Sequence, residues 1–133
     1  MIKNLKFNHL GLAVKDQSKA KELLYSLNYR LIDDVHDDNQ NVRVALLKND
    51  LQLDIEIISK ININDETPID KIINHNSFAT YHICFEYENF DDLRKRKEES
   101  FLSKFLKKYI HPFLKKKFLF IYDSIGLIEI IHS

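Results

Sequence analysis

Two histidines and two glutamates recur along the chain at one spacing. The segment Ile55–Ile58 (IEII) is repeated as Ile128–Ile131, 73 residues later, and the same offset relates the first histidine of the chain to the fourth. The separation from histidine to glutamate is therefore 47 residues in each half of the sequence. The four residues related in this way are His9, Glu56, His82 and Glu129. A repeat of this kind predicts two copies of one structural unit.

These residue types can bind a metal. Imidazole and carboxylate ligands together suit Ni²⁺, Co²⁺, Zn²⁺ or Mn²⁺, whereas a closed structural zinc site more often uses thiolates. A glutamate within an apolar strand is costly to bury ionised, and a bound cation would remove that cost. The alternative, that the glutamates face water on edge strands and the histidines pack in the core, does not explain the matched spacing. We therefore predict one divalent ion, with coordination positions left open for substrate oxygens.

The elements expected around these residues form two similar series. In the first half, a helix capped by Asp16 or Ser18 carries apolar residues at helical spacing, namely Ala20, Leu23, Leu24 and Leu27. The strands expected with it are Leu5–Val14, Tyr29–Val35, Val42–Lys48 and Leu51–Ser59, with a hairpin turn at Asn49-Asp50. Thr67-Pro68 should begin a short connecting helix.

The second half repeats the pattern. We expect strands at Tyr81–Tyr87, Phe118–Tyr122 and Gly126–Ile131. A helix capped by Asn89 or Asp91 should follow the first of them, with an apolar stripe of Leu93 and Phe101–Leu106. The sequence therefore predicts an α+β fold of two βαβββ modules in a single domain, residues 1–133. Module one should span about 5–59, the linker about 60–78 and module two about 79–132.

Alternation along the first strand separates two faces. One face carries His9 with Phe7, Gly11 and Ala13, and the other carries Leu10, Leu12 and Val14. Small residues beside a histidine can line a cup, while the continuous apolar face should be covered by a helix. Cys84, two residues after His82 on the same face, is expected to be such a small lining residue rather than a nucleophile.

Composition excludes several classes of protein. Twenty basic and twenty acidic residues cancel, which gives no support for nucleic-acid binding. The single cysteine cannot form an internal disulfide. We also expect no membrane association and a cytoplasmic location, because no apolar run reaches the ~18 residues of a membrane span. The stretch Arg94–Lys117 contains ten basic and two acidic residues, and is either a solvated surface or a patch for substrate phosphates. The remaining histidines have no partner pattern: His36, His75, His111 and His132.

The combined pattern resembles the vicinal oxygen chelate superfamily, which includes glyoxalase I, bleomycin-resistance proteins, extradiol dioxygenases and methylmalonyl-CoA epimerase. The resemblance covers nearly the whole chain and is carried by four segments. They are His9–Val14 (HLGLAV), Tyr81–Glu86 (YHICFE), Asp91–Leu93 (DDL) and Gly126–Glu129 (GLIE). Ile55–Ser59 (IEIIS) followed by Thr67–Ile69 (TPI) is most similar to methylmalonyl-CoA epimerases and their glyoxalase-like bacterial relatives.

The resemblance implies a cupped mixed sheet with a central metal site. It also implies an isomerase or epimerase that moves a proton alpha to a carbonyl through a metal-bound enolate, with Glu129 as ligand and base. The substrate would be an acyl thioester, or a hemithioacetal if the chain is a glyoxalase I-type lactoylglutathione lyase. A homodimer is expected. A non-catalytic, resistance-type binding protein is the alternative of another class, and a dioxygenase is disfavoured because such enzymes use two histidines and one carboxylate.

The chain departs from the epimerase pattern in two places. Epimerases resemble one another in having a further Glu before the third strand, whereas here that position reads Asn39, so that Asp37 or Asp38 would have to substitute. The glycine-containing turn before the last two strands is replaced by Pro112–Lys117 (PFLKKK). Both departures bear on the epimerase assignment and leave the superfamily assignment intact.

Overall fold

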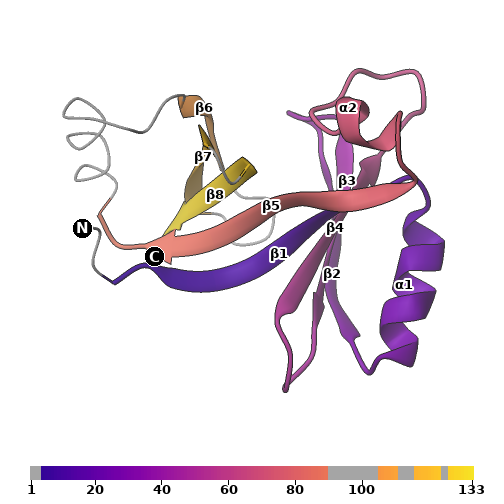
Figure 1. The fold of residues 1–133 in the computed structure, drawn as a ribbon, viewed down its shortest axis with the longest axis horizontal. Helices are drawn as coiled ribbons and strands as arrows, with labels where there is room; N and C mark the ends of the chain where they lie inside the picture. The colour runs from indigo at the N-terminus through magenta and orange to yellow at the C-terminus, as the bar shows by residue number, and fades with distance from the viewer. Residues whose placement is uncertain (1–3, 90–104, 111–115, 124–125) are drawn as a thin grey trace. The chain divides into compact units, whose positions relative to one another are not determined.

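The structure is a computed structural model that describes residues 4–89, 105–110, 116–123 and 126–133. Two compact units make up the chain: one is His9–Tyr81, and the other joins Met1–Asn8 to His82–Ser133. Two strands have residues in both units, β1 (Lys6–Val14) and β5 (Phe78–Tyr87) (Figure 1). Each histidine of the repeat is the residue at which one of these strands passes from one unit to the other.

The unit His9–Tyr81 contains the strand order β2-β3-β4-β1. Its further elements are β2 (Arg30–Asp37), β3 (Val42–Lys48), β4 (Asp54–Lys60), α1 (Gln17–Ser26) and α2 (Asp70–Ile73). β1 pairs with β4 in parallel, while β2 with β3 and β3 with β4 are antiparallel. The predicted strand–helix–strand–strand–strand order of module one is thereby confirmed. β4 begins three residues later than expected, because the amide of Leu51 donates to Asn49 Oδ1 at 2.9 Å and Leu51–Leu53 remain in the turn.

Helix α1 packs on one face of this sheet. Its cap is Asp16, whose Oδ1 accepts from the backbone N–H of Lys19 at 3.1 Å, so the alternative cap at Ser18 is not used. Of the predicted apolar stripe, Leu24 is buried and Ala20 is partly buried, in a cluster with Val14, Ala45, Leu47 and Ile57. Leu23 and Leu27 are exposed, contrary to the expected core-facing stripe. Helix α1 therefore packs on the sheet through fewer apolar residues than its sequence predicts.

A partly buried ion network joins α1 to β2 and β3. The Asp34 carboxylate accepts from Nε and Nη2 of Arg43, both at 2.7 Å, and also contacts Lys21 Nζ. The hydrogen bond from Arg43 is the main cause that lowers the pKa of Asp34. The Asp34 carboxylate therefore contributes to the free energy of unfolding at pH values above its ordinary pKa of 3.8. This contribution is lost as the pH falls through the lower pKa of the folded state.

Asp34→Asn is expected to lower the free energy of unfolding by about 1–2 kcal/mol at neutral pH, because two cations lose a charged hydrogen-bond acceptor. Denaturant unfolding at pH 7 and at pH 2.5 measures the effect, and the difference from wild type should shrink at the lower pH. Asp38→Asn, at an exposed position, is the matched control and should change stability by less than about 0.5 kcal/mol. An equal loss at both pH values would contradict the electrostatic origin.

The second unit contains the strand order β5-β8-β7-β6. Its strands after β5 are β6 (Phe105–Ile110), β7 (Lys117–Asp123) and β8 (Gly126–His132). β5 pairs with β8 in parallel, and β6 with β7 and β7 with β8 are antiparallel. β8 begins at Gly126 with a φ of +105°, which a residue with a side chain rarely adopts. Tyr87, Leu119, Ile121 and Ile130 form a buried apolar cluster in this unit.

The predicted strands at Tyr81–Tyr87, Phe118–Tyr122 and Gly126–Ile131 are confirmed within β5, β7 and β8. The expected helix is wrong at Phe105 and Leu106, which belong to strand β6, and this strand pairs with β7. The rest of that helix falls on 90–104, outside the described residues. In the part of the chain that the structure describes, no helix is long and apolar enough to cross a membrane.

Candidate metal-binding residues

His9 and Glu56 form a buried pair in the unit His9–Tyr81. In the parallel ladder of β1 and β4, Glu56 is in register with Gly11, two residues after His9. His9 Nε2 lies 3.7 Å from Glu56 Oε2. The two residues are only 1% and 4% exposed. An imidazole and a carboxylate are thus held together out of contact with bulk water.

His82 and Glu129 form the equivalent pair in the other unit. In the parallel ladder of β5 and β8, Glu129 is in register with Cys84, two residues after His82. His82 Nε2 lies 3.0 Å from Glu129 Oε2, and both residues are 2% exposed. The pair therefore repeats the composition, burial and strand relationship of the first.

The identical register explains the spacing of 47 residues seen in the sequence. In each unit the histidine stands two residues before the strand partner of the glutamate, which places both side chains on the same face of a parallel strand pair. A shift of one residue in the register of either strand pair would turn the histidine or the glutamate to the opposite face of the sheet. In the structure, the sequence repeat corresponds to two pairs of side chains with the same strand register.

The donor set fits a divalent cation. The buried residues His9, Glu56, His82 and Glu129 could hold a metal ion, each offering one imidazole nitrogen or carboxylate oxygen. Two carboxylates balance the charge of such an ion, and borderline metals accept this mixture of nitrogen and oxygen. A cation also offsets the cost of holding carboxylates in a buried environment.

Small and aromatic residues surround the pairs. The strand partners of the glutamates, Gly11 and Cys84, are buried, as the sequence predicts for lining residues. On the other side Glu129 is in register with Phe120, whose ring centroid is 5.8 Å from that of His82. Phe120 was not singled out in the sequence. The run Phe118–Ile121 is apolar and buried at every position, so the sequence does not show which face Phe120 occupies, and only the hairpin register places it against Glu129.

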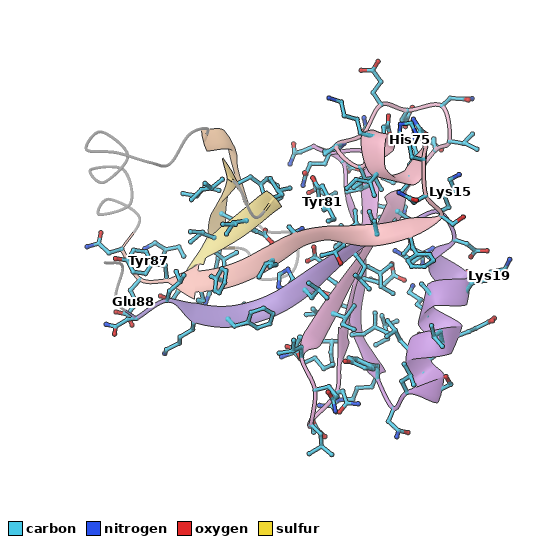
Figure 2. The ribbon with its side chains drawn as sticks, in the orientation of Figure 1. Lys15, Lys19, His75, Tyr81, Tyr87 and Glu88 are labelled. Carbon is cyan, nitrogen blue, oxygen red and sulfur yellow. The ribbon has the colours of Figure 1, made fainter. Side chains whose placement is uncertain are left out.

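The other candidate residues lie apart from these pairs or have structural partners. Asp37 is buried and caps its own turn, accepting from the amide of Asn39 at 3.1 Å and from Nε2 of Gln40 at 2.7 Å. Asp38 is exposed, as are the lone histidines His36, His75 and His132, while His111 lies outside the described residues. His75 lies beside α2 (Figure 2).

The basic stretch is only partly described. Lys116 pairs with Glu86 at 2.6 Å, which gives this lysine a structural partner. Residues 94–104 and 111–115 lie outside the described part of the chain. A phosphate patch between Arg94 and Lys117 therefore stays a prediction.

The chain matches one family of known proteins by its sequence. The family model described as Glyoxalase/Bleomycin resistance protein/Dioxygenase superfamily matches residues 8–109. No curated protein sequence matches the chain significantly.

Solved structures resemble the chain over almost its whole length. A hypothetical protein from Bacillus halodurans C-125 superposes with a TM-score of 0.82 at 20% identity, covering 98% of this chain and 96% of the other. Methylmalonyl-CoA epimerase from Mycobacterium tuberculosis gives a TM-score of 0.79 at 21% identity, covering 96% and 87%. A variant of the Streptomyces coelicolor epimerase, in complex with 2-nitronate-propionyl-CoA, gives 0.78 at 17% identity, covering 96% of each chain. The predicted vicinal oxygen chelate fold, an α+β fold with a mixed sheet, is confirmed.

Proposed function

Because the chain belongs to the glyoxalase/bleomycin resistance protein/dioxygenase superfamily, we propose that it is a divalent-metal-dependent isomerase of the methylmalonyl-CoA epimerase type. The reaction moves a proton alpha to the carbonyl of an acyl thioester. The observation that carries this proposal is the presence of two buried His–Glu pairs with the same strand register.

In this proposal His9, Glu56, His82 and Glu129 together hold one ion of Ni²⁺, Co²⁺, Zn²⁺ or Mn²⁺. Such an ion would supply Lewis-acid stabilisation of the negative charge that develops on the oxygen of a substrate carbonyl. An ion of five- or six-fold coordination held by these four side chains would keep positions for substrate oxygens, whereas a tetrahedral ion would not.

Glu129 is the proposed base. Its carboxylate lies in a buried strand, 3.0 Å from an imidazole nitrogen of His82 and in register with Phe120. His82 orients the carboxylate, and the ring of Phe120 helps to exclude water from it. Glu129 then accepts the proton alpha to the carbonyl and returns it, either to the same carbon face or, with a second acid, to the opposite one.

A specific observation favours a second candidate, a glyoxalase I-type lyase acting on a hemithioacetal. Inversion at carbon needs an acid on the opposite face, and the turn residue Asp37 is already engaged in two hydrogen bonds within its own turn. A single base is sufficient for proton transfer between adjacent carbons. Asp38, exposed in the same turn, is the remaining carboxylate there that could serve an epimerase.

Proton exchange tests the proposal directly. Metal-loaded protein in D₂O is expected to replace the alpha proton of methylmalonyl-CoA with deuterium, followed by NMR or mass spectrometry. Exchange with inversion supports the epimerase, and exchange only into a methylglyoxal hemithioacetal with conversion to product supports the lyase. If neither thioesters nor hemithioacetals exchange, the chain is a binding protein and the catalytic proposal is wrong.

A further inference from the structure

A cavity of about 530 Å³ lies between helix α1 and the adjoining ends of β1 and β5, within the unit His9–Tyr81. Small-molecule sites in proteins have volumes of about 300–1,000 Å³. Its apolar lining comes from Leu12, Val14, Ala20, Leu23, Leu24 and Phe78. Leu23 and Phe78 are 61% and 72% exposed, so the cavity opens between two large apolar side chains.

The cavity is separate from the His9–Glu56 pair. Leu12 and Val14 alternate along β1 with Gly11 and Ala13, which lie on the same strand face as His9. Residues of opposite parity in a strand project from opposite faces of the sheet. A ligand in this cavity would therefore contact the helix-covered face of β1, and the proposed metal would lie on the other.

Charged side chains border the apolar lining. Lys15 and Lys19 stand at the N-terminal end of α1, where Figure 2 labels both, and they line the cavity together with Asp16. Lys19 Nζ lies 3.8 Å from Asp16 Oδ2. Among the described residues no carboxylate is within ion-pair distance of Lys15, whose backbone N–H donates to the carbonyl of Ser77 at 2.9 Å. The border thus carries a net charge of +1, with the Lys15 ammonium as the available cation.

We propose that this cavity binds an amphiphilic carboxylate, a saturated fatty acid of medium chain length, with its chain against Leu12, Val14 and Leu24 and its carboxylate beside Lys15. At about 30 Å³ per heavy atom, the share of a liquid water, the 12 heavy atoms of decanoate occupy roughly 360 Å³, which the cavity accommodates. A longer chain would extend past Phe78 into water.

A second copy of the chain fits this surface less well. Protein interfaces bury about 800 Å² on each partner around an apolar core that is depleted in lysine. Here the exposed apolar residues of the cavity lining are Leu23 and Phe78 alone, and the surface between them is concave and bordered by two lysines. A hollow with one unpaired cation is better matched by a chain with a single negative end.

Calorimetric titration of the whole protein with octanoate and decanoate, below their micelle concentrations, tests the proposal. Each added CH₂ that is buried should tighten binding about fourfold, so decanoate should bind roughly 15-fold more tightly than octanoate. Decyltrimethylammonium should bind weakly because Lys15 repels it. Equal affinity for the anionic and cationic amphiphiles would overturn the assignment of the ligand class.

Variants locate the site. Ala20→Phe fills the cavity and should weaken decanoate binding tenfold or more, whereas Ser18→Phe, on an exposed position of the same helix, should leave it unchanged. Leu23→Glu, at an exposed position that tolerates substitution, should weaken decanoate binding even if Ala20→Phe fails to fold. Lys15→Gln should weaken the binding of decanoate about two- to fivefold and leave the binding of decanol unchanged. Lys71→Gln, which removes a lysine charge outside the cavity lining, is the control and should leave both unchanged.

Two results would overturn the proposal. One is decanoate binding that is unaffected by both Ala20→Phe and Leu23→Glu. The other is no decanoate binding by wild type together with dissociation of a dimer by Leu23→Glu in sedimentation velocity, which would assign the surface to a second copy. Metal content of each variant, measured in parallel, should remain at the wild-type value because the opposite face of β1 is untouched.

Discussion

Glu129→Gln is expected to lower the rate of alpha-proton exchange with solvent deuterium by about 10² or more, the usual loss when a general base is removed. The amide keeps an oxygen that can contact a metal, but it cannot accept the proton. Metal content should therefore remain substantial while exchange falls. Mass spectrometry of the recovered thioester and metal analysis of the same protein sample measure the two effects together.

Glu88→Gln is the matched control, because it removes one carboxylate at an exposed position just beyond β5 and should leave exchange unchanged. Exchange that persists in Glu129→Gln would move the base to another carboxylate, with Glu56 first, since it occupies the equivalent position in the other pair. Loss of both metal and exchange would show that Glu129 acts mainly as a ligand.

Replacement of both glutamates, Glu56→Ala with Glu129→Ala, is expected to abolish stoichiometric metal binding. Each substitution removes the only carboxylate of one His–Glu pair, and two imidazoles alone do not balance the charge of a divalent ion. Purified protein should contain about one ion per chain in the wild type and none in the double variant. Equilibrium dialysis followed by elemental analysis measures the stoichiometry.

The exposed histidines supply the control for this experiment. His36→Ala and His132→Ala should leave metal content unchanged, because both residues are exposed and lie outside the two pairs. Tight stoichiometric binding that survives in the double glutamate variant would place the metal elsewhere and remove the basis of the proposed mechanism.

The candidate pairs could be predicted from the sequence because the same spacing from histidine to glutamate occurs in both halves of the chain. Each glutamate follows its histidine by 47 residues, so the match between His9 and His82 carries over to Glu56 and Glu129 without knowledge of the intervening fold. The hydrogen-bonded ladders then impose the same offset of two residues in both units. Short elements with clear alternation or turn residues, such as β3 at Val42–Lys48, were predicted for the same local reasons.

Elements decided by distant partners were not predicted. Phe105–Ile110 (FLKKYI) has an apolar pattern that fits one turn of helix as well as a strand, and its pairing with β7 settles the matter. Leu23 and Leu27 satisfy helical spacing, yet they remain exposed because α1 contacts the sheet mainly through Leu24. Phe120 approaches His82 only through the register of a hairpin. In each case the deciding interaction lies outside the local sequence.

Each unit contributes one imidazole and one carboxylate, and this equal division has a thermodynamic consequence. With the proposed ion bound, opening of either unit would remove half of the ligands, so the stabilities of the two units would be linked through one binding equilibrium. An ion whose free concentration is 100 times its dissociation constant stabilises the folded state that binds it by about 2.7 kcal/mol. Both units depend on this stabilisation. A chelator would remove this stabilisation from both units at once.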